Sequence, residues 1–252
     1  MWWAGIMRAM DVRPSVAVTG ACGRIGRALV EHLAARRYPL VLVDRPTRGL
    51  EAMAPLGAVV ELDLADQPPA GLFDGVQVVV HLAGEARHDA SWDSLLPDNI
   101  QASYHVASAA MRAGCRRLIV ASSVHAVSAS AQRPVAPNDP VAPADLYGAT
   151  KCFVEALAFW CAQRGPMSAA AVRIGAFQPV EAGQASGAEW MADTFIAAPD
   201  LVSLLERAIS AEYRFALLHA AAPGCNVLLD TRATENLLGW SAEHRFLPAS
   251  DR

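Results

Sequence analysis

The sequence predicts a doubly wound α/β fold, with a parallel sheet of about seven strands flanked by helices and a small C-terminal substrate-binding part. Short β-branched segments alternate with helical segments along the 252 residues, a pattern typical of parallel strands joined by right-handed crossovers. Several strand segments are almost wholly apolar, as expected of strands covered on both faces. Hydrophobic residues make up 53% of the chain, which is ample material for a buried core.

The first half of the chain contains four strand segments. Residues 15–20 (SVAVTG), 39–44 (PLVLVD) and 58–63 (AVVELD) are short and rich in β-branched residues, and 76–84 (VQVVVHLAG) is almost wholly apolar. Residues 24–37 (RIGRALVEHLAARR) have apolar residues at helical spacing, and a second helical stretch is expected over 96–113.

The second half continues the alternation. Strands are expected at 116–123 (RRLIVASS), 167–175 (MSAAAVRIG) and 213–220 (YRFALLHA), and helices at 146–164 and about 199–211. Residues 176–198 have weak periodicity and are expected to form a long loop with short helices that covers a site. We expect residues 1–14 to be an N-terminal extension without fixed structure and residues 15–252 to form a single domain.

Composition argues against several classes of protein. The net charge of −4 and the lack of a Lys/Arg block argue against nucleic acid as a partner. No apolar run reaches about 18 residues, so no membrane span is expected, and the N-terminal residues lack the pattern of a signal peptide. Five cysteines without a CxxC motif suit a reducing, cytoplasmic location, and we expect no metal site.

A glycine-rich segment follows the first strand and opens the first helix. VTGACGRIG places Gly20 at a tight turn, Gly23 where backbone can approach a pyrophosphate, and Gly26 where helix and sheet pack closely. This context predicts a Rossmann fold that binds a dinucleotide. Asp44, at the end of the second strand, can accept hydrogen bonds from the ribose hydroxyls and favours NAD over NADP. Arg45 and Arg48 follow it and can bind the 2′-phosphate of NADP. Asp63, followed by Leu64, either meets the adenine ring or caps a loop.

YGATK, residues 147–151, places a phenol and an amine on one face of a helix. An adjacent ammonium can lower the pKa of a tyrosine towards the range useful for proton transfer. Such a pair is often surface decoration, but here Ser123 and His125 end a neighbouring strand, on the edge where ligands bind in open sheets.

The segments TGACGRIG, HLAG (81–84), ASS (121–123) and YGATK resemble the short-chain dehydrogenase/reductase superfamily, in its extended epimerase/dehydratase branch. DLYGATKCFVEALA, AVRIG, residues 195–209 and LLGW are similar to the uronate dehydrogenases in particular. That resemblance implies NAD as cofactor, a homo-oligomer, and oxidation of the C1 hydroxyl of a hexuronic acid to a lactone. The cofactor residues implied are Gly20, Gly23, Arg24, Ile25, Gly26, Asp44, Asp63, Leu64, Leu82, Ala83, Gly84, Tyr147 and Lys151.

The resemblance also implies roles in catalysis. Tyr147 would act as base, Lys151 would lower its pKa and bind ribose, and Ser123 would hydrogen-bond the reacting oxygen with Ser122 beside it. Arg173 would clamp the substrate carboxylate, because its planar fork suits two parallel hydrogen bonds, or it would be a structural arginine. His125 would line the sugar pocket or be an ordinary loop histidine.

The substrate positions depart from the family pattern. Val124 replaces an Asn, Glu85, Ala86 and Arg87 replace a segment with a Ser, and Ala176 replaces another Ser. An intact catalytic set with a changed substrate set predicts the same chemistry on a different small hydroxy compound; Glu85 and Arg87 can also be solvated loop charges. Two other functions remain open at this stage: a nucleotide-sugar epimerase or dehydratase, which the short segment after residue 220 disfavours, and a non-catalytic NAD-binding regulator.

Overall fold

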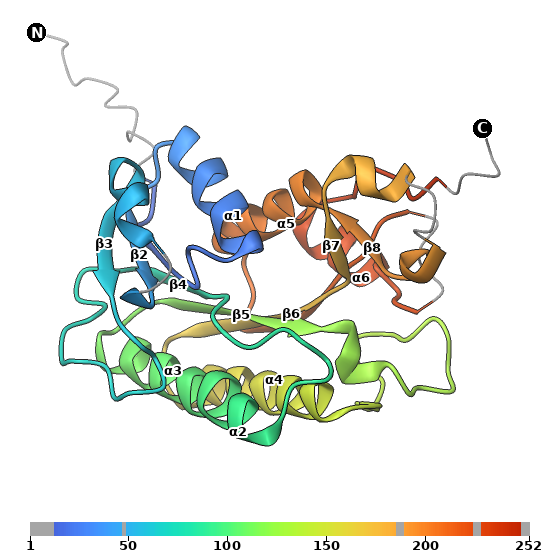
Figure 1. The fold of residues 1–252 in the computed structure, drawn as a ribbon, viewed down its shortest axis with the longest axis horizontal. Coiled ribbons are helices and arrows are strands. Elements are labelled where there is room, and N and C mark those ends of the chain that lie inside the picture. Colours follow the sequence, from blue (N-terminus) through green and yellow to red (C-terminus); the bar gives the residue numbers. More distant parts are fainter. Residues whose placement is uncertain (1–12, 47–48, 185–188, 224–227, 248–252) are drawn as a thin grey trace, which may run out of the picture.

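The computed structural model describes residues 13–46, 49–184, 189–223 and 228–247, and most of the predicted N-terminal extension lies outside these ranges. Within them, seven parallel strands form one sheet in the order β3-β2-β1-β4-β5-β6-β9 (Figure 1). The order reverses between β1 and β4, so the carboxyl ends of these strands form a switch point of the kind where doubly wound sheets bind ligands. The predicted fold class is confirmed. The strands are β1 Val16–Thr19, β2 Leu40–Asp44, β3 Ala58–Glu61, β4 Val78–His81, β5 Arg117–Ser123, β6 Ser168–Ile174 and β9 Phe215–Ala220.

Two layers of helices cover the sheet (Figure 1). The helices α1 (Arg24–Ala35) and α5 (Ala198–Ser210) pack together on one face, where their buried residues join one apolar cluster with β1 and β6. The helices α3 (Ala102–Arg112) and α4 (Leu146–Arg164) cover the other face and contribute to a second cluster. Strands buried between two such layers explain the continuous apolar runs in the sequence.

Local signals fix where these helices begin and end. Asp145 caps α4, since its Oδ1 accepts a hydrogen bond of 2.7 Å from the Gly148 N–H. The helix ends at Gly165, before Pro166. Pro199 lies in the first turn of α5, where its missing N–H has no helical partner to lose. The observed α4 coincides with the predicted helix 146–164.

Two predicted segments differ from the structure. The stretch 96–113 is not one regular helix: α2 (Trp92–Leu95) leads into a wide π-helical turn, η3 (Leu96–Gln101), and then into α3. The predicted loop 176–198 contains two short strands, β7 (Ala176–Gln178) and β8 (Phe195–Ala197), that pair in parallel, although residues 185–188 lie outside the described ranges. Short helical turns and one further helix complete the chain: η2 Leu50–Leu56, η4 Val124–Val127, η5 Val180–Gln184, η6 Glu189–Met191 and α6 Arg232–Leu238.

Candidate functional site

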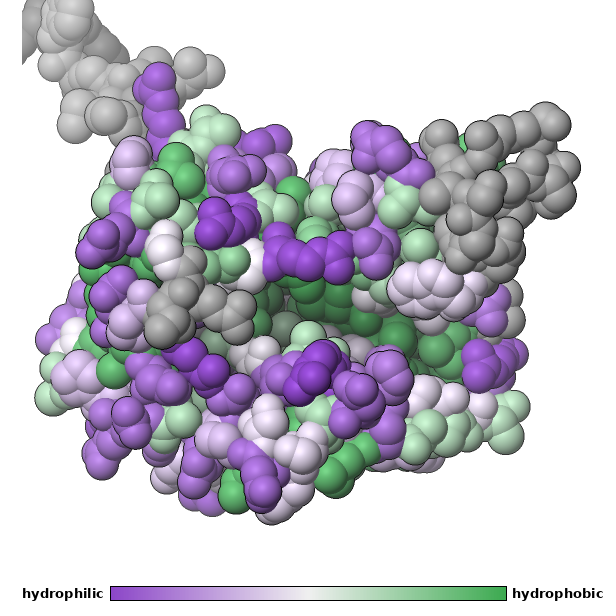
Figure 2. All heavy atoms as spheres, in the orientation of Figure 1, coloured by the Kyte–Doolittle hydropathy of each residue, from purple (hydrophilic) through white to green (hydrophobic). Residues whose placement is uncertain are grey.

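The surface is hollowed between the α1 side and the α2 side of the molecule, with apolar residues on the floor and polar residues along both rims (Figure 2). This groove runs along the carboxyl edge of the sheet. The register explains why: Thr19, at the end of β1, lies opposite Val43 on one side and His81 on the other, so three strands end at the same level.

The glycine turn after β1 has the shape of a phosphate cradle. Gly20 has φ +69°, and a Cβ there would lie 2.6 Å from the Ala83 N. A Cβ on Gly26 would lie 2.1 Å from the Gly20 carbonyl oxygen, so α1 packs directly on the turn. Gly23 precedes α1 without any side-chain cap, which leaves the first N–H groups of the helix for an anion. These residues fit the pyrophosphate of a dinucleotide.

The other predicted cofactor residues line this turn. The Asp44 carboxylate accepts hydrogen bonds of 2.8 Å from the Cys22 and Arg45 N–H groups, which fixes it beside the glycine turn. Ile25 and Leu82 pack on the core beneath. Arg24 reaches across to β7, where it donates to the Phe177 carbonyl (3.0 Å) and to Gln178 Oε1 (2.7 Å).

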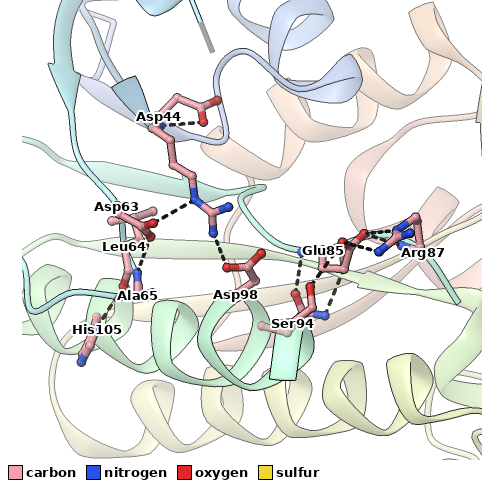
Figure 3. Close-up of polar contacts among 11 residues, drawn as sticks. Asp44, Asp63, Leu64, Ala65, Glu85, Arg87, Ser94, Asp98 and His105 are labelled. Carbon is pink, nitrogen blue, oxygen red and sulfur yellow. Dashed lines mark hydrogen bonds and ion pairs between the residues drawn. The ribbon is translucent and has the colours of Figure 1, made fainter. Parts of the chain in front are cut away.

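Asp63 follows β3 and does two things at once. Its Oδ1 accepts a hydrogen bond of 3.0 Å from the Ala65 N–H, which is the loop cap left open by the sequence. Its Oδ2 lies 3.2 Å from Arg45 Nε (Figure 3). Leu64 is buried, and its carbonyl accepts a hydrogen bond of 2.9 Å from His105 Nδ1, which ties this loop to α3.

Tyr147, Lys151 and Ser123 converge where β5 meets α4. Ser123 lies close enough to Tyr147 to lower the pKa of its phenol, and Lys151 Nζ lies 5.4 Å from the centroid of the Tyr147 ring. The Lys151 ammonium donates to the Ala121 carbonyl at 3.0 Å. All three side chains are buried, and the chain geometry places them on the edge of the sheet that carries the glycine turn.

The electrostatics of this cluster differ from the simple expectation for a tyrosine beside an ammonium. Burial raises the pKa of Tyr147; the hydrogen bond with Ser123 lowers it, and the carboxylates of Asp145 and Glu85 raise it. Burial lowers the pKa of Lys151 to about 8. The predicted lowering of the Tyr147 pKa by Lys151 is therefore absent from the structure, because desolvation and two nearby carboxylates favour the neutral phenol.

His125 lies in a row of rings beside Tyr147. Its ring centroid is 5.4 Å from that of Tyr147, in an edge-on arrangement, and 6.0 Å from that of His88, in a stacked one. The Nδ1 atom of His125 lies 2.6 Å from Asp145 Oδ2, so the carboxylate that caps α4 also orients the imidazole. This arrangement places His125 next to the phenol, with its ring oriented by Asp145.

Arg173 and Ser122 share Glu155 as a hydrogen-bond partner. The Arg173 side chain is 1% exposed, and its Nε and Nη2 donate to the two oxygens of Glu155 at 2.8 and 2.9 Å. Ser122, opposite Arg173 in the sheet, donates to the same carboxylate at 2.6 Å. The predicted carboxylate clamp and the predicted substrate contact of Ser122 do not fit this geometry, because Glu155 already occupies both donors; the structural alternative for Arg173 does fit.

The charged segment after β4 borders the site. Arg87 donates to Glu85 from its N–H at 3.0 Å and from its guanidinium at 3.4 Å, and the Ser94 hydroxyl donates to Glu85 at 3.4 Å (Figure 3). Arg87 is well exposed, whereas Glu85 is largely covered. Val124, the replacement for a polar residue, packs into an apolar cluster with Val127 and Val135.

Two buried polar residues in the site were missed by sequence reasoning. Asn99 is 1% exposed in the π-helical turn; its Oδ1 accepts from the Glu85 N–H at 2.8 Å, and its Nδ2 donates to Thr150 Oγ1 at 3.0 Å. His81 hydrogen-bonds Thr19 (2.7 Å) and Ser103 (3.1 Å), and burial, together with the charge of Lys151, lowers its pKa to about 3. A polar residue within an apolar strand was the available signal for His81.

In the part of the chain that the structure describes, no cluster of three or more His, Cys, Asp or Glu side chains is arranged to hold a metal ion. No helix in that part of the chain is long and apolar enough to cross a bilayer.

Comparison with known proteins supports a dinucleotide-binding enzyme fold. The sequence profile of the NAD dependent epimerase/dehydratase family matches residues 16–178. The chain is 36% identical over 174 residues to an L-arabinose 1-dehydrogenase (NAD(P)(+)) of Haloferax volcanii, a match that covers 64% of this chain and 66% of that protein.

Two further relatives are uronate dehydrogenases. The enzyme of Agrobacterium fabrum is 32% identical over 225 residues, which cover 88% of this chain and 78% of that protein. A solved structure of a mutated uronate dehydrogenase superposes with a TM-score of 0.80 at 28% identity, covering 92% of this chain and 82% of the other.

Proposed function

The chain belongs to the NAD-dependent epimerase/dehydratase family, and from that premise we propose that it oxidises the C1 hydroxyl of a small sugar to a lactone, with Tyr147 as the base. The resemblance to uronate dehydrogenases and the expectation of an NAD-dependent enzyme of the short-chain dehydrogenase/reductase type are confirmed by these relatives. The observation that carries the proposal is the convergence of Tyr147, Lys151 and Ser123 at the edge of the sheet that holds the glycine turn.

Each residue of the cluster has a distinct role. The glycine turn and the N-terminus of α1 would hold the pyrophosphate, and Asp44 the adenosine ribose. NAD, when bound, supplies the hydride acceptor and a positive charge. That charge opposes the effects of burial and of Asp145 and Glu85, which hold the Tyr147 pKa above its ordinary value.

The proton follows a short path. The Ser123 hydroxyl, which lies beside the phenol, would orient the sugar hydroxyl, and the Tyr147 phenolate would accept the hydroxyl proton at Oη. Lys151, held by the Ala121 carbonyl, keeps a cation beneath the phenolate. Asp145 Oδ2 lies 2.6 Å from His125 Nδ1 and so orients the imidazole ring beside the Tyr147 phenol, where it would form one wall of the sugar pocket.

The substrate can be a sugar acid, as in the uronate dehydrogenases, or a neutral aldose. The neutral aldose is favoured by charge. Arg173 is fully engaged by Glu155, and residues 176–198 contain no Lys, Arg or His. Glu85 and Asp145 are close enough to Tyr147 to raise its pKa, so they would repel a substrate carboxylate and accept hydrogen bonds from sugar hydroxyls.

NADH production by the purified chain tests the proposal against glucuronate, galacturonate, arabinose and glucose. The Tyr147→Phe variant is expected to lose turnover while its affinity for NAD, followed by tryptophan fluorescence, stays unchanged. A variant that keeps most of its rate would remove Tyr147 as the base. NAD binding without NADH production from any sugar would favour the epimerase or regulator alternatives, and tight retention of cofactor through purification would favour the epimerase.

A further inference from the structure

Asp44 and Arg45 give opposite signals for the choice of coenzyme. A carboxylate at the end of the second strand suits the free ribose hydroxyls of NAD, whereas an arginine beside it suits the 2′-phosphate of NADP. The structure fixes Asp44 through two backbone N–H groups, those of Cys22 and Arg45, at 2.8 Å. The position of Arg45 therefore decides whether a cation is available next to that ribose.

Arg45 is held by two carboxylates that come from separate parts of the chain (Figure 3). Its Nε lies 3.2 Å from Asp63 Oδ2, in the loop after β3, and its Nη2 donates to Asp98 Oδ1, in the π-helical turn η3. Asp63 is itself fixed by its cap on the Ala65 N–H, and Asp98 is largely covered, with 17% of its side chain exposed. The Nε and Nη2 groups, which together form one edge of the guanidinium fork suited to a phosphate, are thus engaged by carboxylates.

The charges in this cluster do not cancel. One arginine stands against the three carboxylates of Asp44, Asp63 and Asp98, which leaves a net charge of −2 (1 − 3) where the adenosine ribose is expected. A 2′-phosphate, which carries up to two negative charges, would be repelled by this cluster, whereas the hydroxyls of unphosphorylated ribose can donate to carboxylates.

We propose that the ion pairs from Arg45 to Asp63 and Asp98 set the coenzyme specificity of this protein, by holding the Arg45 guanidinium away from the 2′-phosphate of NADP. Asp63 and Asp98 are thereby specificity-determining residues, although they lie outside the predicted ribose clamp. The proposal concerns the cofactor site and does not depend on which sugar is oxidised, or on Tyr147 as the base.

The test measures the dissociation constants of NAD⁺ and NADP⁺ by fluorescence titration, in the full chain and four variants. Asp98→Asn and Asp63→Asn remove one charge each while keeping an oxygen acceptor, so the Asp63 cap on Ala65 is preserved. Each is expected to tighten NADP⁺ binding about tenfold, the gain from one charge-assisted contact. In Asp98→Asn, which lies outside the expected cofactor residues, NAD⁺ binding is expected to change less than about twofold. Adding Arg45→Ala to Asp98→Asn is expected to abolish the gain.

Asp74→Asn is the matched control, because Asp74 is an exposed carboxylate in the loop before β4 and its removal changes only the overall charge. Thermal melting shows that each variant is folded. Parallel shifts for both coenzymes, an equal gain from Asp74→Asn, or a gain that survives Arg45→Ala would each overturn the proposal. Failure of the wild-type chain to bind NAD⁺ would overturn it too, whereas loss of sugar oxidation in Tyr147→Phe bears on the proposed function alone.

Discussion

Glu155→Gln is the substitution that best separates a structural Arg173 from a substrate clamp. The variant keeps the shape of the side chain and removes the charge that balances a guanidinium with 1% of its side chain exposed. Two hydrogen bonds from Arg173, at 2.8 and 2.9 Å, and one from Ser122, at 2.6 Å, lose their anionic acceptor, and His219 Nε2 at 3.3 Å is the remaining side-chain contact of Arg173 that the structure records.

Breaking one side of a buried ion pair costs about 3–5 kcal/mol in the free energy of unfolding. For a domain of this size, that corresponds to a fall in Tm of about 6–20 °C. Urea unfolding and thermal melting, followed by tryptophan fluorescence, measure both quantities. The double variant Glu155→Gln/Arg173→Met removes the stranded charge and is expected to regain part of the loss.

The control for this experiment is Arg232→Gln, which breaks an ion pair with Asp230 whose arginine is 80% exposed. Solvent screens such a pair, so no measurable change in stability is expected. A loss below about 1 kcal/mol in Glu155→Gln, together with a raised KM for uronic acids, would refute the structural reading of Arg173 and restore the clamp.

Three further predictions rest on other parts of the structure. Burial lowers the pKa of His81 to about 3 and that of His219 to about 4, from an ordinary value of 6.5, so the unfolded chain binds protons that the folded chain does not. The free energy of unfolding, measured with urea, is therefore expected to fall by about 2 kcal/mol per histidine between pH 7 and pH 5. Equal stability at the two pH values would contradict this. Gly26→Ala places a Cβ 2.1 Å from the Gly20 carbonyl oxygen and is expected to lower both NAD affinity and stability, by about 1–3 kcal/mol in the latter, whereas Gly165→Ala, with no atom within 4 Å of its added Cβ, is expected to be neutral in the same binding and melting assays. The exposed Phe159 and Trp160 of α4 fit the homo-oligomer expected from the sequence, so Phe159→Asp is expected to lower the mass measured by light scattering, and an unchanged mass would count against this face.

Much of the fold could be predicted because the chain alternates clearly. The order of strands and helices and the limits of α4 followed from the alternation of apolar segments, and the glycine turn followed from its place between a strand and a helix; these signals are local. The strands β7 and β8 were missed because each has three residues and pairs only with the other, which leaves no periodic pattern to detect. The π-helical turn was missed because its distinguishing hydrogen bonds leave no mark on the spacing of apolar residues.

The site was harder to predict than the fold, because its side chains depend on distant partners. Nothing in the local sequence of Arg173 or Ser122 indicates that their donors bond to Glu155, on a helix that packs against the sheet. The pKa of Tyr147 is raised by burial and by the carboxylates of Asp145 and Glu85, and the sequence spacing of Tyr147 and Lys151 gives no sign of these effects. Sequence spacing reports which residues share a face, and it does not report the dielectric around them.

Asn99 links the segment after β4 to the first turns of α4. Its side chain holds the Glu85 backbone, through the N–H and the carbonyl, and it donates to Thr150, whose hydroxyl donates to the Tyr147 carbonyl at 2.7 Å; a Cβ on Gly84 would lie 2.8 Å from its Oδ1. A change at this single amide is therefore expected to move the Gly84–Glu85 backbone and the turn that carries Tyr147 together, so two segments that are far apart in the sequence share one fixed point.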